Sequence, residues 1–560
     1  MTKLLLGPSI RRRVLAALVI GALAASGMAS AHGDSRDHGF RFVPGNLVVS
    51  RSVYDNKASN IAVGTILAPN CANTTGGCSA ATGAPYDGSY PYVWNNVLYD
   101  PNFGVTSRIF LDQVTPDGWL VNSLEVPNSS LPTAMAGELV TSFSSKSELS
   151  LHRSLDHRYL TFVGYVAPID AIDVSNANTP GVIDSTNPDG QNFYRAVATV
   201  DSHGHFDFTE TNAYSGDNGR TAILNNRDGA NYFYTAGNAG NGSNPQPPGV
   251  VIGTGAQLIT PVNLPEVMQS PGVDTPVASF SVTALGQKAD KIGKDDNFRG
   301  MTVFNNVLYY TKGSGSNGVN TVYFVDTTGK ACPNGIGLPV PGALLPSAPL
   351  AYDAGTLATS GLPTNMCILA GFPSTPNKSA TTVAYPFGIW FADANTVYVA
   401  DEGDGYTGGS DLYTHAAAQT TAGLQKWVFN AATQNWTLAY TLQTGLGLGQ
   451  PYTVRDYPVG NNPATGLPWS PATDGLRNFT GQVGRDGKVT LWAVTSTVSG
   501  NGDVGADPNR LVAIRDDLKN TSPAVAAKES FVTLRAAKFG ETLRGVSFAP
   551  DAGDDHGRHH

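Results

Sequence analysis

Apolar and polar residues alternate with a period of two over short runs of the chain, and Gly, Asn, Asp or Pro separates these runs. Such a pattern is typical of β-strands that bury one face and connect through tight turns. A helical period does not persist over any long stretch outside the N-terminal segment before residue 31. The pattern therefore predicts an all-β fold.

Several of these runs are versions of one unit, which reads strand, tight turn, strand. The first residue of the unit precedes the turn aspartate by eight positions in both Glu148–Asp156 and Arg220–Asp228. Matching units, and two strands that follow one of them, occur at Arg299–Tyr310, Phe387–Ala400, Arg477–Val494, Gly423–Phe429 and Trp436–Tyr440. Repeats of this kind predict the four-stranded blades of a β-propeller.

A sixth copy of the unit is divided between the two ends of the chain. Leu543–Pro550 supplies one strand, and Asn46–Arg51 can supply the next. Their pairing in one blade would close the ring and remove a free sheet edge that could otherwise pair with another chain. We therefore predict one six-bladed β-propeller domain over residues 45–550, or a seven-bladed one if Val250–Ala284 forms another sheet.

The connections within the units differ in length. Turns between the first and second strands are short, as at Asp228–Gly229 and Asn305–Asn306, whereas the segments after the second strand are long. The longest of these is the insertion 53–107. In a propeller such segments emerge on one face, where the innermost strands also begin, and one-sided insertion is how repeat proteins build a site. This favours a binding face over insertions that are merely tolerated at the surface.

Four of the predicted innermost strands have an arginine near their start, with an acid three residues before it. The arginines are Arg220, Arg299, Arg477 and Arg544, and the acids are Asp217, Asp296, Asp474 and Glu541. Glu148 takes the equivalent place in the second blade, and Phe387, preceded by Tyr385 and Pro386, takes it in the fifth. Each acid could hold its own arginine within the blade. Alternatively, the guanidinium groups could form an anion seat at the mouth of the channel, because their planar fork binds carboxylate or phosphate in a bidentate manner.

A glycine-rich segment after the fifth unit carries closely spaced acids, among them Asp401, Asp404 and Asp411. Hard oxygen ligands on a flexible loop suit Ca²⁺, so we consider a calcium site here. The segment lacks the regular ligand spacing of an EF-hand, and an ordinary solvated acidic loop is the alternative.

The N-terminal segment 1–31 reads as a signal peptide, because Arg11–Arg13 precede an apolar run that ends in the small-x-small pattern Ala29–Ala31. General secretion and twin-arginine export both stay open. We expect flexible tails at 32–44 and 551–560, no membrane-spanning segment in the mature chain, and a periplasmic or extracellular location. An oxidising location fits the four cysteines, which we pair as Cys71 with Cys78 and Cys332 with Cys367.

Composition excludes several classes of protein. The 560 residues carry 35 Lys and Arg against 44 Asp and Glu, a net charge of −9, with 63 Gly and 36 Pro. This balance argues against a nucleic-acid binder that relies on basic charge and against a coiled coil. The chain has no Gly-x-Ser-x-Gly elbow, no phosphate-binding glycine loop and no His-Glu-x-x-His motif, so a serine hydrolase or zinc peptidase has no support.

The strings Asn46–Arg51, Leu424–Phe429 and Leu543–Pro550 resemble a widespread group of exported bacterial propeller proteins without an established activity. The resemblance implies a propeller over nearly the whole mature chain and brings no catalytic residues with it. An arginine cluster in a six-bladed channel is also similar to the sialidases, in which three arginines hold a substrate carboxylate. Calcium-dependent lactonases and propeller phytases share the six-bladed architecture.

Two functions from different classes follow. As a hydrolase or lyase, the protein would hold an anionic substrate on the four arginines and Tyr385, with Glu148 as base or nucleophile, assisted by Asp296 or a bound Ca²⁺. As a binding protein, it would hold an anionic glycan, a phosphate ester or a partner protein on the same face without chemistry. We expect a monomer in both cases.

Overall fold

The computed structural model of the chain describes residues 39–54, 62, 105–131, 138–143, 145, 147–172, 174–175, 177–181, 191–238, 255–261, 297–313, 318–348, 350, 365–462, 466–501 and 504–552. The part from Phe40 onward forms one compact unit. The predicted signal peptide, Cys71, Cys78 and most of the insertion 53–107 lie outside the described residues, so these expectations stay predictions.

The described strands form six small sheets, each with the innermost strand given first here. The first contains β25 (Glu541–Phe548), β1 (Leu47–Val53), β2 (Thr106–Val114) and β3 (Leu120–Glu125), with β4 (Thr141–Ser142) paired to β2. The second contains β5 (His152–Arg153), β6 (Tyr159–Tyr165), β7 (Arg195–Asp201) and β8 (Phe206–Thr211). The third contains β9 (Gly219–Asn225), β10 (Tyr232–Gly237) and β11 (Ala256–Ile259).

The remaining three sheets continue in chain order. The fourth contains β12 (Phe298–Phe304), β13 (Val307–Lys312), β14 (Thr321–Val325), β16 (Met366–Leu369) and β15 (Ile336–Gly337). The fifth contains β17 (Pro386–Asp393), β18 (Thr396–Asp401), β19 (Gly423–Asn430) and β20 (Asn435–Leu442). The sixth contains β21 (Ala472–Val483), β22 (Lys488–Val498), β23 (Arg510–Asp517) and β24 (Val532–Ala536).

Helices in the described part of the chain are short. They are η6 (Asn377–Ser379), α2 (Leu412–Ala418), η7 (Val504–Ala506) and α3 (Pro523–Ala526). None of them has the length and apolar character that a membrane crossing requires.

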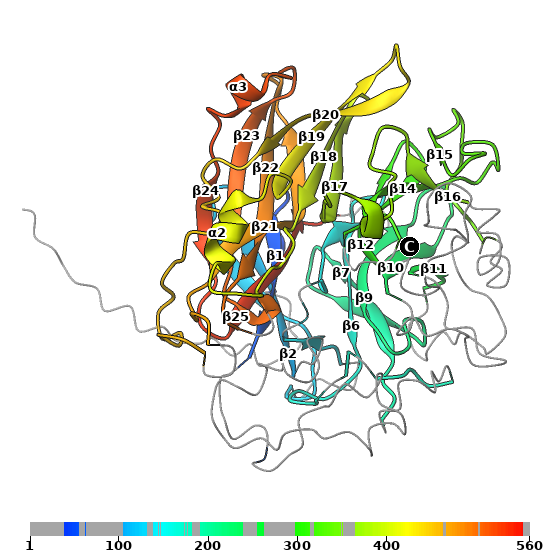
Figure 1. Cartoon of the computed structure of the whole chain (residues 1–560). Helices are drawn as coiled ribbons and strands as arrows, with labels where there is room; N and C mark the ends of the chain where they lie inside the picture. The colour runs from blue at the N-terminus through cyan, green and yellow to red at the C-terminus, as the bar shows by residue number, and fades with distance from the viewer. Residues whose placement is uncertain are drawn as a thin grey trace, which may run out of the picture. The chain divides into compact units, whose positions relative to one another are not determined.

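The six sheets stand in a ring, because contacts link the inner strands of each sheet to those of the next, and β21 of the sixth sheet to β25 of the first. Figure 1 follows this order through the colours, with β1 in blue and the last strands in red. The predicted six-bladed β-propeller is confirmed. The stretch Val250–Ala284 supplies β11 to the third blade, within the six-sheet ring.

Ring closure occurs as the sequence predicts. Strand β1 pairs antiparallel with β25, from Leu47 opposite Phe548 to Val53 opposite Glu541, and on its other side with β2. The strand from the N-terminal part therefore has partners on both edges, and the strand from the C-terminal part becomes the innermost strand of the same blade.

The turns between first and second strands lie at one end of the sheets. Asn305 and Asn306 connect β12 to β13 with φ of 48° and 59°, the left-handed pair that a two-residue type I′ hairpin needs. At the other end, the start of each inner strand pairs with the end of the second strand, as Phe298 does with Lys312 and Pro386 with Asp401. We call the end with these turns the turn face and the opposite end the loop face. The long segments after the second strands leave from the loop face.

The hydrophobic core lies between neighbouring blades. Each of the six interfaces has its own buried cluster, and apolar burial of this kind contributes about 1.5–3 kcal/mol per large side chain. One residue from each side of the six interfaces illustrates them: Val48 with Phe162, Val163 with Ala222, Tyr234 with Phe298, Tyr309 with Phe391, Tyr398 with Leu491, and Trp492 with Leu47. The central strands are therefore fixed from both sides, which gives a rigid frame for groups that line the channel.

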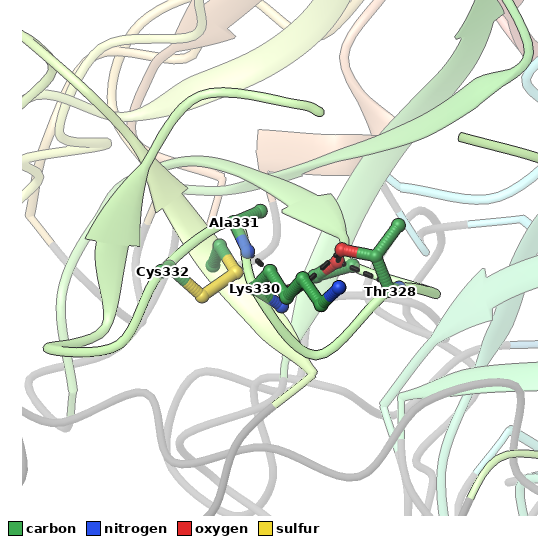
Figure 2. The surroundings of a disulfide bond; sticks show 6 residues. Thr328, Lys330, Ala331 and Cys332 are labelled. Atoms are coloured by element: carbon green, nitrogen blue, oxygen red, sulfur yellow. Dashed lines mark hydrogen bonds between the residues drawn. A yellow bond between two sulfur atoms is a disulfide. The ribbon is translucent and has the colours of Figure 1, made fainter. Parts of the chain in front are cut away.

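The predicted bond between Cys332 and Cys367 is present, with the two Cα atoms 5.9 Å apart. It ties β16 to the loop after β14, as Figure 2 shows. The same loop is held by the Asp326 carboxylate, which accepts hydrogen bonds from the amides of Thr328 and Ala331, both at 2.8 Å. The disulfide thus holds the outer part of the fourth blade in place.

Candidate functional site

Three of the four predicted arginines gather around one carboxylate on the loop-face side of the channel. Glu402 Oε1 lies 3.6 Å from Nε of Arg299, and Glu402 Oε2 lies 3.3 Å from Nε of Arg477. Arg220 feels the charges of both Arg299 and Glu402. We call these four residues the Glu402 cluster. All four are buried, with 2% to 7% of their surface exposed.

The sequence suggested Glu402 as one of the closely spaced acids of the candidate calcium segment and did not place it with the arginines. It directly follows β18, whose last residue, Asp401, pairs with the first residue of the inner strand β17. This position puts it at the loop face next to the channel, and its amide donates to the Tyr385 carbonyl at 3.0 Å. The blade register could have indicated it, because the residue after each second strand lies beside the start of an inner strand.

Arg220 is buried and donates to neutral partners at the Glu402 cluster. Its Nε donates to Ser147 Oγ at 2.8 Å and its Nη1 to the Phe298 carbonyl at 2.7 Å. Burial, and then the positive charge of Arg299, lower the pKa of Arg220 to about 9. Asp217 and Glu402 act in the opposite direction without cancelling the effect.

Arg544 is anchored through different groups. Its Nε donates to Ser52 Oγ at 3.1 Å, and its Nη2 donates to the Phe143 carbonyl. These contacts connect the innermost strand β25 to its neighbour β1 and to the segment after β4. The ring of four guanidinium groups suggested by the sequence therefore has three members at Glu402 and a fourth with contacts of its own.

The acids three residues before the arginines bind loop groups. Asp217 accepts from the Asn218 amide at 2.9 Å and from the Asn238 side chain. Asp474 accepts from the Gly405 amide at 2.9 Å and from the Gln419 side chain. Glu541 forms an ion pair with Arg51 of β1 at 2.9 Å, and Asp296 lies outside the described residues. Asp217 and Asp474 thus hold loops at the loop face, whereas Glu541 pairs with a neighbouring strand.

Glu148 is fully buried, and its carboxylate is surrounded by donors. Oε2 accepts from Thr141 Oγ1 at 2.6 Å and from the Ser142 amide at 3.2 Å. Oε1 accepts from Asn218 Nδ2 at 2.8 Å and from the Tyr165 hydroxyl. With four donors around it, this side chain joins the second blade to the loop before β9. Its predicted role as a base stays a prediction.

Tyr385 lies half-buried beside the Glu402 cluster. Its amide donates to Asp401 Oδ2 at 2.8 Å, and its carbonyl accepts from the Glu402 amide. Burial, reinforced by the negative charges of Asp404 and Asp401, raises the pKa of the Tyr385 hydroxyl. The hydroxyl is therefore a neutral donor at physiological pH, as a substrate-binding role would need.

The predicted calcium ligands have separate partners. Asp401 accepts from the Gly403 amide at 2.9 Å, Asp404 lies 2.6 Å from His415 Nε2, and Asp411 accepts from the Tyr406 hydroxyl at 3.2 Å. Across the described residues, the group of three or more possible metal ligands whose atoms all lie within 4.8 Å of one another is Asp326, Cys332 and Cys367, and its two sulfurs are engaged in the disulfide. Calcium binding by Asp401, Asp404 and Asp411 stays a prediction.

Fold and site together define a six-bladed β-propeller with a buried basic cluster on the loop-face side of its channel. No protein-family model matches the chain, and a search of curated proteins finds no match either.

Proposed function

We propose that this chain is an exported β-propeller that binds a small anionic molecule, carrying a carboxylate or a phosphate, at the loop-face mouth of its channel. The observation that carries the proposal is the sharing of Glu402 by Arg299 and Arg477 while Arg220 lies within range of the same charges. Glycans with acidic groups belong to the same chemical class, and a protein partner with an acidic loop is the macromolecular alternative.

The charge balance of the Glu402 cluster favours an anionic ligand. Burial is the main reason that the pKa of Arg220 is lowered to about 9, and the positive charge of Arg299 adds to it. A bound anion would reverse this effect, because an opposite charge within a few ångströms favours the ionised guanidinium. The planar fork of arginine also matches carboxylate and phosphate oxygens in pairs. Rearrangement of the Arg299 and Arg477 side chains away from Glu402 would open donors to such a ligand.

A thermal-shift panel of sugar acids, phosphate esters and lactones, with and without Ca²⁺, tests the proposal. A ligand that binds the folded state raises the melting temperature. The variant Arg299→Gln should remove the shift, whereas Arg455→Gln, at a side chain that is 94% exposed, should keep it. Equal shifts in both variants, or no shift with any anion of the panel, would overturn the proposal.

A hydrolase or lyase is the second candidate, and one observation favours it. Burial raises the pKa of Asp401, which directly precedes Glu402, to about 6, close to the range in which a carboxylate can accept a proton at neutral pH. Glu148→Gln tests the base suggested by the sequence. Loss of turnover with retained ligand binding would support the enzyme, and unchanged behaviour in both would favour a binding protein.

A further inference from the structure

A cavity lies at the turn-face mouth of the channel, at the opposite end from the Glu402 cluster. It has a volume of about 670 Å³, and every innermost strand contributes to its wall. The contributions come from the later parts of β5, β9, β12, β17, β21 and β25, together with the turns that follow β5, β9 and β12. This turn-face cavity is thus distinct from the Glu402 cluster, which lies towards the starts of the same strands.

The wall of the turn-face cavity has two unlike halves. The second and third blades contribute the nitrogen-bearing side chains His152, Arg153, His157 and Arg227, next to the apolar Leu151, Leu155 and Ile223. The fifth and sixth blades contribute Ile389, Trp390 and Phe479. In a ring of six, the second and third blades stand across the channel from the fifth and sixth. A basic side therefore faces an aromatic side across the cavity.

Charge on the basic side is only partly balanced. Among the described residues that line the cavity there is no aspartate or glutamate. The nearest carboxylate contacts come from Asp551, whose oxygens lie 3.6 Å from Arg153 Nη1 and 3.8 Å from His157 Nδ1. Arg227 is held through Nε by the Leu155 carbonyl at 2.6 Å, which is a neutral partner. Of the two guanidinium groups, Arg153 thus has an ion pair with Asp551 and Arg227 donates to a neutral carbonyl, while the charge of Asp156 also acts on His157.

His152 supplies a polar atom without a partner. Its Nε2 is buried and has no hydrogen-bond partner among the described residues. A buried polar group in this condition loses its hydrogen bonds to water and gains none in return, so it usually marks a ligand, a water or a functional role. His152 lines the cavity, but this nitrogen is itself shielded from it.

We propose that the turn-face cavity binds a small planar aromatic carboxylate. Its ring would pack on Trp390 and Phe479, and its carboxylate would lie near Arg153 and Arg227. An aromatic wall offers stacking surface, and arginine offers charge-assisted hydrogen bonds to a carboxylate. The volume also falls within the range of about 300–1,000 Å³ that small-molecule sites occupy.

Isothermal titration of the full chain with 2-naphthoate tests this site. Two matched probes separate its two halves: 2-naphthamide keeps the ring and removes the charge, and cyclohexanecarboxylate keeps the charge and removes the aromatic ring. We expect one naphthoate per chain and binding of each matched probe weaker by about tenfold or more. Absence of naphthoate binding, or equal binding of naphthoate and naphthamide, would overturn the proposal.

Variants localise the binding within the protein. Arg153→Gln and Trp390→Leu should each weaken naphthoate binding by about tenfold. Arg158→Gln, in the same hairpin but outside the cavity lining, is the matched control and should bind as the unmodified protein does. If Arg153→Gln fails to fold, the exposed Arg227→Gln replaces it. Arg299→Gln should leave naphthoate binding unchanged; a loss there would place the probe at the Glu402 cluster and overturn the proposal.

Discussion

Glu402 Oε2 lies 3.3 Å from Nε of Arg477, and both side chains are 3% exposed. This pair joins the loop of the fifth blade to the innermost strand of the sixth. Glu402→Gln removes the negative charge and leaves buried guanidinium groups without compensation, so we expect the free energy of unfolding to fall by about 3–5 kcal/mol. Urea denaturation measures the change.

Asp456→Asn is the control for that experiment, because Asp456 also pairs with an arginine but is 77% exposed. Exposed pairs of this kind contribute about 0–1 kcal/mol. A loss of the same size in both variants would mean that the Glu402 cluster has no special electrostatic role.

Lys426 and Asp516 form a second buried pair, between the fifth and sixth blades. Lys426 Nζ lies 3.0 Å from Asp516 Oδ2, with both side chains fully buried, and it also donates to the carbonyls of Asp517 and Asn520. We expect Lys426→Met to lower the free energy of unfolding by about 3–5 kcal/mol, because it leaves a buried carboxylate unpaired. Lys528→Met, at an exposed position, should change the free energy of unfolding by less than about 1 kcal/mol. Chemical denaturation of both variants measures the two changes.

Asp507 should make stability depend on pH. Burial raises its pKa to about 7. Its Oδ1 accepts from the hydroxyls of Tyr457 and Ser499, and its Oδ2 has no hydrogen-bond partner among the described residues, which fits a protonated carboxyl. The folded state therefore holds a proton that the unfolded chain releases near pH 4, and the stability from this group is lost as pH rises from about 4 to about 7.

Asp507→Asn removes this titration. The difference in unfolding free energy between the unmodified protein and the variant should fall with rising pH, by at most about 1.4 kcal/mol per pH unit. Thermal or urea unfolding at pH 4, 5, 6 and 7 gives the slope. A difference that stays flat, or rises, across this range would contradict the assignment.

The bond between Cys332 and Cys367 closes a segment of 35 residues. Replacing both cysteines with serine should lower the free energy of unfolding by about 3–4 kcal/mol, because the unfolded chain regains the freedom that the crosslink removes. The double variant of Cys71 and Cys78 is the comparison, since a bond between them would close a much shorter loop and should matter less. The double variant of Cys332 and Cys367 should therefore have the lower melting temperature of the two.

Much of the fold could be predicted because blades are local. Each hairpin lies within a short stretch of sequence, and period-two alternation with turn residues such as Asn305–Asn306 reports it directly. Closure between β1 and β25 was also predictable, because two half-units at the ends of a repeat array are incomplete without each other. A repeated pattern within one sequence can therefore indicate the fold by itself.

The site was less predictable because it depends on side-chain contacts between blades. Arg220, Arg299 and Arg477 were visible as a repeated feature, but the contact of Arg544 with the Phe143 carbonyl depends on a segment that follows no repeat. Glu402 belongs to a loop without periodicity. The two halves of the turn-face cavity become apparent only when the blades are placed around a ring, since residues 152 and 390 are far apart in sequence.

The pairing of β1 with β25 also sets an order for assembly. Hairpins within the other five blades can form as soon as their own residues are available, whereas Arg51 meets Glu541 across 490 positions of sequence. Contacts of such separation are slow to form, so the first blade is completed last. Until β25 pairs with it, β1 has one unpaired edge to which a strand of another chain could bind. Loss of β25 would therefore favour association between chains over closure of the ring.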